Sequence, residues 1–559
     1  MQSLANSKPK GQDLADQNGS HRGIRPAIAT SVETGIAGTV AGGVQMPAMF
    51  ASVAAVSAPA AATSQSASVT ATATQTKTVG AVSFPSWLSK ITTASIKTDM
   101  CAAISNGAVT YSGLLKLVQD LNTTLSTSKA NLTSTQFQDL QTVVANLNNG
   151  VTTSAYLTGI MTNLVNGNAA NATWTGGGAS SVALGNLKAG TTATQLSELT
   201  GKWLLGTDLP SSKVYMSGAS PFSVTYSNST KAVYGTSGPS MNDINQGYLG
   251  DCYLLACLEE VAYTNPNTIK SMITSNGNNT YGVCFNVNGK QQYVTVNTAL
   301  ANGGNIFNYG SNIWASLVEK GYAQLQAGGV VTGNTVNYGN SWSTIGNGGC
   351  PEYALEQITG SSTITDFCAS KGSWTQVTYN SSLKLTGYST GKSTAAIQSI
   401  LINDLAAGDD LILSSWTNGK DSAGKTTLVA GHAMSIYGFD SKTGMFQIRN
   451  PWGTYAGQYW DTTFEVGLST LLAAGDTITA DAIGTKKVTA SGTTSAGTTS
   501  VRSINAAGPY TSEPLNVSAA ASSFTHAIAQ VNTAPQASAF VNLVRPMQGE
   551  QNHLFSPKI

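Results

Sequence analysis

Charged residues are scarce in this chain. They make up 10% of its 559 residues, against roughly 25% in an ordinary soluble domain. The 28 Lys and Arg nearly balance the 27 Asp and Glu, so no excess of one sign points to nucleic acid or to an anionic membrane as a partner. Apolar runs are short, and none reaches the roughly 18 residues that a membrane-spanning helix needs. The composition therefore favours a protein with no nucleic-acid partner and no transmembrane segment.

Cysteine and histidine are also few. The six Cys form no Cys-x-x-Cys pair, and three of the four His (His21, His526 and His553) lie near the chain ends. A structural zinc site needs four clustered Cys or His ligands, so a zinc-dependent fold is excluded. Low charge with abundant Ser, Thr, Gly and Asn is typical of exported prokaryotic proteins. Secretion to the extracellular space is therefore favoured over a cytoplasmic location.

The distribution of tryptophan indicates where the chain folds. All nine Trp lie between Trp87 and Trp460, and Trp brings a large buried area to a core. Residues 1–84 are expected to be a disordered low-complexity arm, although the small apolar residues of 49–62 leave an export signal open. Residues 484–559 are expected to be a Ser/Thr/Gly-rich linker and tail.

Two folded regions are expected between these ends. In 85–205 the apolar residues of 137–147 and 156–165 follow helical spacing, with Thr133 or Ser134 as an N-cap of the first helix, so a small all-α accessory domain is predicted. In 206–483 short alternating runs bounded by Gly, Asn and Ser are interspersed with a few helices. This second pattern indicates an α+β domain.

The segment "NDINQGYLGDCYLLACLEEVA" (242–262) carries the first chemical signal. Apolar residues after Cys252 form one face of a helix, and Gly247 and Gly250 form a tight turn before it, so Cys252 is expected in the first turn of a buried helix. There the unpaired N–H groups and the helix dipole favour a thiolate, with a pKa below the free value of about 8.5. The amide of Gln246 could donate to an oxyanion forming beside Cys252.

A nucleophilic thiol needs a base, and His432 is the single His of the region between the chain ends. It stands in "LVAGHAMSIYGFD", which alternates like a strand, and "MFQIRNPWG" supplies a second strand after a turn. If Phe439 faces Met445, His432 and Asn450 are diagonal neighbours on the hairpin. Asn450 could then fix the imidazole tautomer and aim the other ring nitrogen at Cys252.

Each of these residues also has an ordinary structural interpretation. A Cys on a helix and a His on a strand are usually core residues, and Asn-Pro is usually a turn. The conjunction of all three with Gln-Gly-x-x-Gly before the Cys favours a catalytic constellation.

These segments resemble the calpains, and more distantly the papain-like peptidases. The signature "QGYLGDCYLLA" is similar to the calpain cysteine block, and "GHAMSIYGF" and "IRNPWG" to its histidine and asparagine blocks, in the same order; "NIWASLVEKGYAQL" and "PEYALEQITG" agree as well. The resemblance covers about 235–465. It implies catalytic Cys252, His432 and Asn450, with Gln246 in the oxyanion hole. It also implies a papain-like core cleft between two subdomains, which meet near 360–385.

Further details are implied by the same resemblance. Gly431 and Trp452 would support the substrate cleft, and no cofactor is required. Asp243 and Glu319 are similar to acidic calcium ligands of the family; their ordinary roles would be a turn acid and a solvated helix carboxylate. The D-x-[DN]-x-[DN]-G loop of a calcium-binding helix–loop–helix domain is absent, which suits a bacterial protein.

The sequence therefore predicts a cysteine endopeptidase of the calpain type that acts on proteins or peptides through an acyl-enzyme. A transglutaminase or amidase on the same fold is one alternative, although such enzymes commonly carry Asp in place of Asn450. A catalytically retired binding or surface protein is the other.

Overall fold

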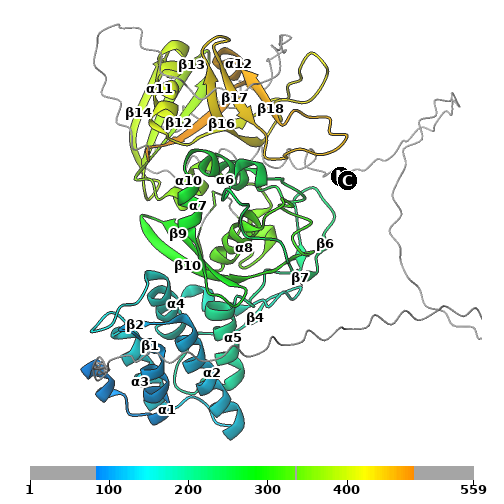
Figure 1. The fold of residues 1–559 in the computed structure, drawn as a ribbon. Coiled ribbons are helices and arrows are strands. Elements are labelled where there is room, and N and C mark those ends of the chain that lie inside the picture. Colours follow the sequence, from blue (N-terminus) through cyan, green and yellow to red (C-terminus); the bar gives the residue numbers. More distant parts are fainter. Residues whose placement is uncertain (1–83, 331, 334–335, 484–559) are drawn as a thin grey trace, which may run out of the picture. The chain divides into compact units, whose positions relative to one another are not determined.

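The computed structural model describes residues 84–330, 332–333 and 336–483. Every helix and strand below lies within these ranges (Figure 1). The low-complexity arm expected before residue 84 and the tail expected after 483 lie outside the described residues. Helices and strands are both abundant, which confirms the predicted α+β class. No helix in the described ranges is long and apolar enough to cross a membrane.

The first folded region is helical. Its helices are α1 (Ala94–Ala103), α2 (Tyr111–Ser128), α3 (Ser134–Ala145), α4 (Ala155–Val165) and α5 (Ala193–Thr200), with short strands β1 (Ile104–Ser105), β2 (Ala108–Val109), β3 (Thr173–Trp174) and β4 (Val182–Ala183). Thr133 caps α3 in a reciprocal capping box with Gln136, which satisfies first-turn N–H groups. Both helices expected from apolar spacing are thus confirmed. The buried Leu, Ile and Val side chains of this region form a hydrophobic cluster of their own.

The helical region contacts the next one through polar and aromatic groups of α4. The Tyr156 hydroxyl lies 2.8 Å from the Thr295 hydroxyl, and the rings of Tyr156 and Tyr293 pack with centroids 5.9 Å apart. The amide of Gln324 also donates to the Lys202 carbonyl at 3.2 Å. These contacts join the accessory helices to the domain that follows.

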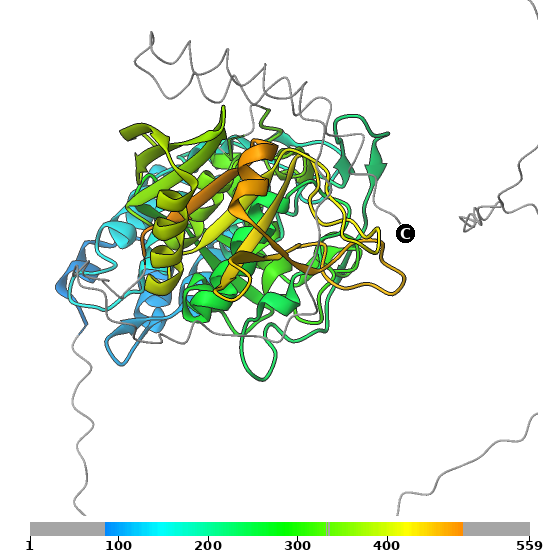
Figure 2. The same cartoon turned by 90° about the horizontal axis from the view of Figure 1, so that it is seen from above.

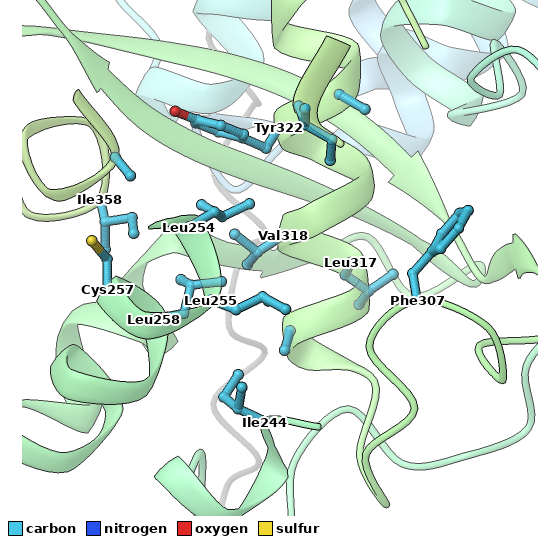
Figure 3. Packing of buried hydrophobic residues seen from close by; sticks show 14 of the residues in the cluster. Ile244, Leu254, Leu255, Cys257, Leu258, Phe307, Leu317, Val318, Tyr322 and Ile358 are labelled. Atoms are coloured by element: carbon cyan, nitrogen blue, oxygen red, sulfur yellow. The ribbon is translucent and has the colours of Figure 1, made fainter. Parts of the chain in front are cut away.

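The middle region contains the helix of Cys252. It comprises α6 (Cys252–Thr264), α7 (Pro266–Met272), α8 (Trp314–Leu325), α9 (Trp342–Ile345) and α10 (Pro351–Thr359), with strands β5 (Lys213–Val214), β6 (Phe222–Ser223), β7 (Tyr226–Asn228), β8 (Ile273–Ser275), β9 (Thr280–Val287), β10 (Lys290–Asn297) and β11 (Ala299–Ala301). Figure 3 shows Leu254, Leu255 and Leu258 of α6 packed against Leu317 and Val318 of α8. Apolar packing on this scale fixes α6 as the central helix of the region.

An eight-stranded antiparallel sheet forms the last region. Its elements are β12 (Thr363–Ser370), β13 (Ser373–Asn380), β14 (Leu385–Lys392), α11 (Thr394–Ala407), β15 (Leu411–Ser415), β16 (His432–Asp440), β17 (Met445–Arg449), β18 (Thr463–Val466), α12 (Leu468–Ala474) and β19 (Thr477–Asp481). The strand order is β14-β13-β12-β19-β15-β16-β17-β18. Strands β16 and β17, which carry the histidine and precede the asparagine, are neighbours in it.

The two faces of this sheet are covered by different helices (Figure 1, and from above in Figure 2). Successive side chains of a strand point to opposite faces. On β15, Leu411 and Leu413 join the cluster that contains residues of α11 and α12, whereas Ile412 joins the cluster of α6. On β16, Met434 belongs to the cluster of α11 and α12, and Ala433 belongs to the cluster of α6. The sheet face that holds Ala433 therefore rests on the helix of Cys252.

Candidate active site

Cys252 occupies the first residue of α6, as the sequence predicts. The turn before it needs glycine because backbone carbonyls approach it closely. A Cβ at Gly247 would lie 2.2 Å from the Ile306 carbonyl oxygen, and a Cβ at Gly250 would lie 2.8 Å from that of Gly346. The Cys252 N–H belongs to the first helical turn, whose amides have no intrahelical acceptor. It is therefore positioned to donate to a group bound beside the thiol.

His432 begins β16. The residue before it, Gly431, has a backbone conformation that only glycine adopts without strain. Gly431 has φ +71°, in the left-handed region that disfavours a Cβ, and its N–H donates to the Ser415 carbonyl at 2.7 Å. This backbone bend starts the strand at the imidazole. The structure thus gives Gly431 a defined conformational role beside His432.

The hairpin brings His432 to Asn450. The His432 Nε2 lies 2.9 Å from the Asn450 Oδ1, and both side chains are buried. The same Oδ1 accepts from the Trp452 N–H at 3.0 Å, which fixes the amide orientation. Because Oδ1 is an acceptor, Nε2 carries the proton of the neutral ring, and Nδ1 carries the lone pair that can act as a base.

The register of this hairpin differs from the expectation near the turn. Phe439 pairs with Phe446 rather than with Met445, and the register shifts between Ile436 and Gly438. The extra residue is Tyr437, a β-bulge that restores the expected pairing on the side of the active site. His432 and Asn450 are accordingly diagonal neighbours although the turn itself was predicted one residue out of step.

The thiol of Cys252 lies against the same strand. The Ala433 N–H donates to the Cys252 Sγ at 3.4 Å, so the thiol is beside the residue that follows the histidine. Cys252, His432 and Asn450, which are distant in sequence, therefore meet at one place. Trp452 covers the imidazole, with ring centroids 4.8 Å apart.

The prediction that the pKa of Cys252 is lowered is wrong for this buried arrangement. Burial raises the pKa of Cys252 to about 12, and the neighbouring Asp251 carboxyl adds to the rise, while the Ala433 N–H opposes it. Burial likewise lowers the pKa of His432 to about 4. The thiol is 5% exposed and the imidazole 2%. Removal of water opposes the effect of the helix N-terminus and favours a neutral thiol beside a neutral imidazole.

Gln246 lies at the site but its amide is already engaged. The Nε2 donates to the Leu249 carbonyl at 2.8 Å and to the Asp251 Oδ1 at 3.4 Å. Its backbone N–H donates to the Pro451 carbonyl at 2.8 Å, which ties the cysteine turn to the loop after Asn450. An oxyanion would have to compete with these acceptors for the amide.

The two acidic residues similar to calcium ligands have other partners. The Asp243 Oδ1 accepts from the Asn312 Nδ2 at 2.6 Å, and its Oδ2 accepts from the Trp314 Nε1 at 2.8 Å and from the Ser240 N–H at 3.0 Å. Both carboxylate oxygens of Asp243 are therefore already engaged by N–H donors. Glu319 is fully buried, and burial with the neighbouring Asp251 raises its pKa. As arranged, Asp243 and Glu319 do not fit a shared calcium ion.

One buried ion pair at the site has no counterpart in the sequence analysis. The Arg449 Nε donates to the Glu259 Oε1 at 2.7 Å, and the Ser435 Oγ donates to the Glu259 Oε2 at 3.0 Å. The sequence signal that could have pointed to it is an acidic residue at helical spacing from Cys252 inside an otherwise apolar stretch.

A cavity of about 440 Å³ lies elsewhere, lined by accessory-region residues such as Asn168 and by Tyr293, Gln324 and Ser382. None of Cys252, His432 and Asn450 lines it. We place the candidate chemistry at Cys252 because the hydrogen bonds converge there. Across the described residues no group of three His, Cys, Asp or Glu could hold a metal ion.

The part of the chain that holds these residues is similar to a known protein family. Residues 225–466, which include Cys252, His432 and Asn450, match the sequence model of the calpain family cysteine protease. Among curated proteins, calpain clp-4 of Caenorhabditis elegans is 28% identical over 241 residues, which cover 39% of this chain and 28% of that protein. The chain thus matches less than a third of the length of this relative.

Proposed function

Because residues 225–466 form a calpain-family cysteine protease domain, we propose that the chain is a cysteine endopeptidase that hydrolyses peptide bonds in proteins through Cys252, His432 and Asn450. The observation that carries the proposal is the bond of 2.9 Å between the His432 Nε2 and the Asn450 Oδ1, formed beside the thiol at the N-terminus of α6. It gives the histidine the tautomer that a general base needs.

The proposed reaction begins from the neutral pair. As the Cys252 Sγ attacks the carbonyl carbon of the scissile bond, the His432 Nδ1 takes the thiol proton, so that no free thiolate has to form in the buried site. The N–H of Cys252 and the Gln246 amide would stabilise the oxyanion. His432 then donates its proton to the leaving amine. Water, deprotonated by the same nitrogen, then attacks the thioester. The C–S bond breaks, His432 returns the proton to the Cys252 Sγ, and the second product leaves as the acid.

Asn450 acts by orientation in this scheme. It holds the His432 Nε2–H, and Trp452 packs over the ring. A neutral amide at this position leaves the pKa of His432 low, whereas a carboxylate would favour the imidazolium. The amide therefore supports hydrolysis over the transglutaminase alternative, whose members commonly carry Asp here.

We further propose that catalysis needs no calcium, since both oxygens of the Asp243 carboxylate accept from N–H donors. Proteins or peptides are the proposed substrates. Export from a bacterial cell stays a prediction from composition.

The test is cleavage of fluorescein-labelled casein by the purified full chain. The wild type should release soluble fluorescence, and Cys252→Ser should reduce the rate at least about a hundredfold. Cys257→Ser is the matched control, because Cys257 lies on the same helix and its thiol donates to the Pro351 carbonyl instead; it should keep the rate. A folded wild type that leaves casein intact, or Cys252→Ser that still cleaves it, would contradict the proposal. Incorporation of a dansylated amine without cleavage would favour the transglutaminase.

A further inference from the structure

One buried carboxylate, that of Glu259 on α6, contacts both strands of the hairpin, β16 and β17. We propose that Glu259 is a positioning residue, which holds the hairpin of His432 and Asn450 in register against α6 by binding Arg449 and Ser435. This inference rests on the proposed peptidase function, because it assigns Glu259 a role in the geometry of that reaction.

The spacing on α6 directs Glu259 toward the same strand as the thiol. Glu259 lies seven positions after Cys252, which is close to two helical turns, so both side chains lie on one face of the helix about 10 Å apart. Along β16 the Ala433 N–H meets the Cys252 Sγ, and the Ser435 hydroxyl meets the Glu259 carboxylate. The helix thus contacts β16 at two points, one at the nucleophile and one beyond it.

The second strand enters through the same carboxylate. Ser435 and Arg449 are directly paired across β16 and β17, so both side chains lie on the sheet face that rests on α6. Arg449 immediately precedes Asn450. A carboxylate that accepts from both members of this pair fixes the two strands relative to each other and to the helix.

The hairpin needs such a constraint because its register changes close by. The bulge between Ile436 and Gly438 lies next to the Ser435–Arg449 pair. A shift of one residue in either strand would send Ser435 or Arg449 to the opposite face of the sheet. Glu259 can bind both side chains only in the register that also brings Asn450 to His432.

Burial of the ion pair disfavours other packings of the hairpin against α6. The Glu259 side chain is fully buried and that of Arg449 is 9% exposed. A buried charge that loses its partner is strongly disfavoured, so alternative packings of the hairpin are excluded. The adjacent Glu260 is equally buried, yet neither of its carboxyl oxygens has a hydrogen-bond partner among the described residues. It therefore provides a matched control on the same helix.

The experiment compares Glu259→Gln with Glu260→Gln in the full chain by the cleavage of a fluorogenic peptide. A peptidyl epoxide titrates the concentration of active sites, and each rate is divided by that concentration. We expect Glu259→Gln to lower kcat about 10- to 100-fold with KM within about threefold, as small misplacements of reacting groups do. Glu260→Gln should keep the wild-type kcat. An unchanged kcat in folded Glu259→Gln would overturn the proposal.

A double variant separates positioning from a structural role. Glu259→Gln combined with Arg449→Gln removes both buried charges, so the melting temperature should recover toward that of the wild type while kcat stays low. Recovery of kcat together with the melting temperature would show that the pair is only structural and would overturn the proposal.

A milder variant keeps the test open if Glu259→Gln does not fold. Ser435→Ala removes one of the two partners, and it should lower kcat about three- to tenfold with little change in melting temperature; an unchanged kcat would count against the proposal. An inactive wild type that the epoxide does not label would instead contradict the peptidase function itself, so the two failures are distinguishable.

Discussion

Replacement of Asn450 by Ala gives a quantitative test of the orienting bond. The substitution removes the acceptor that lies 2.9 Å from the His432 Nε2 and 3.0 Å from the Trp452 N–H. The imidazole that loses this acceptor is enclosed, since Asn450 is 0% exposed and His432 2%. Leaving a buried donor without an acceptor costs about 1–3 kcal/mol.

This free-energy cost disfavours the His432 tautomer and orientation that Asn450 holds in the wild type. At 1.36 kcal/mol for each factor of ten, kcat should fall about 5- to 150-fold, less than in Cys252→Ala, which removes the nucleophile. The measurement is the turnover of a fluorogenic peptide, with far-ultraviolet circular dichroism to verify that the variant is folded. A loss equal to that of Cys252→Ala, or no loss in a folded variant, would refute the orienting role.

Asn450→Asp is the matched control because it keeps an oxygen acceptor. The added negative charge favours the imidazolium, so the pKa of His432 should rise from about 4. The imidazole must be neutral to accept the thiol proton, and the acid limb of the activity profile should therefore move to higher pH. An unchanged limb would show that residue 450 does not contact the imidazole in the working enzyme.

Three further outcomes are expected. Iodoacetamide at pH 8 should modify Cys252 of the resting enzyme at least about 100-fold more slowly than free cysteine, because a pKa of about 12 leaves few thiolates; rapid labelling at pH 6 would contradict the neutral pair. Burial and the neighbouring Asp410 raise the pKa of Glu260, so its contribution to stability is full below its unfolded pKa of about 4 and is lost as pH rises through the folded value. Glu260→Gln should thus stabilise the protein at pH 8 but not at pH 4, and equal urea midpoints of variant and wild type at pH 8 would be inconsistent with this. Chelation of calcium should leave casein cleavage unchanged, and loss of cleavage that added calcium restores would reject the proposed independence of calcium.

Local chemistry made part of the site predictable. The glycine turn and the helix that starts at Cys252 depend on neighbours in sequence, and the structure has both. The strand expected over 428–440 is present as well, but it begins only at His432. The N-cap at Thr133 was predictable for the same reason.

Features that depend on packing between distant segments could not be predicted. The bulge at Tyr437 is set by how β16 and β17 meet the rest of the sheet. The raised pKa of Cys252 follows from its burial among α6, α8 and the sheet, which no property of the helix alone reveals. Asn312 and Trp314, which donate hydrogen bonds to Asp243, lie about 70 residues further along the chain. The role of Asp243 in this hydrogen-bond network was therefore not visible from spacing.

Cys252, activated by His432, is the proposed nucleophile of a peptidase. The most direct measurement is covalent labelling of the full chain with a peptidyl epoxide, followed by intact mass spectrometry and peptide mapping. One equivalent should attach to Cys252 and abolish casein cleavage, and His432→Ala should slow the labelling without unfolding the protein. Label on Cys257, Cys284, Cys350 or Cys368 at the rate of Cys252, or full activity after Cys252 is labelled, would contradict the account.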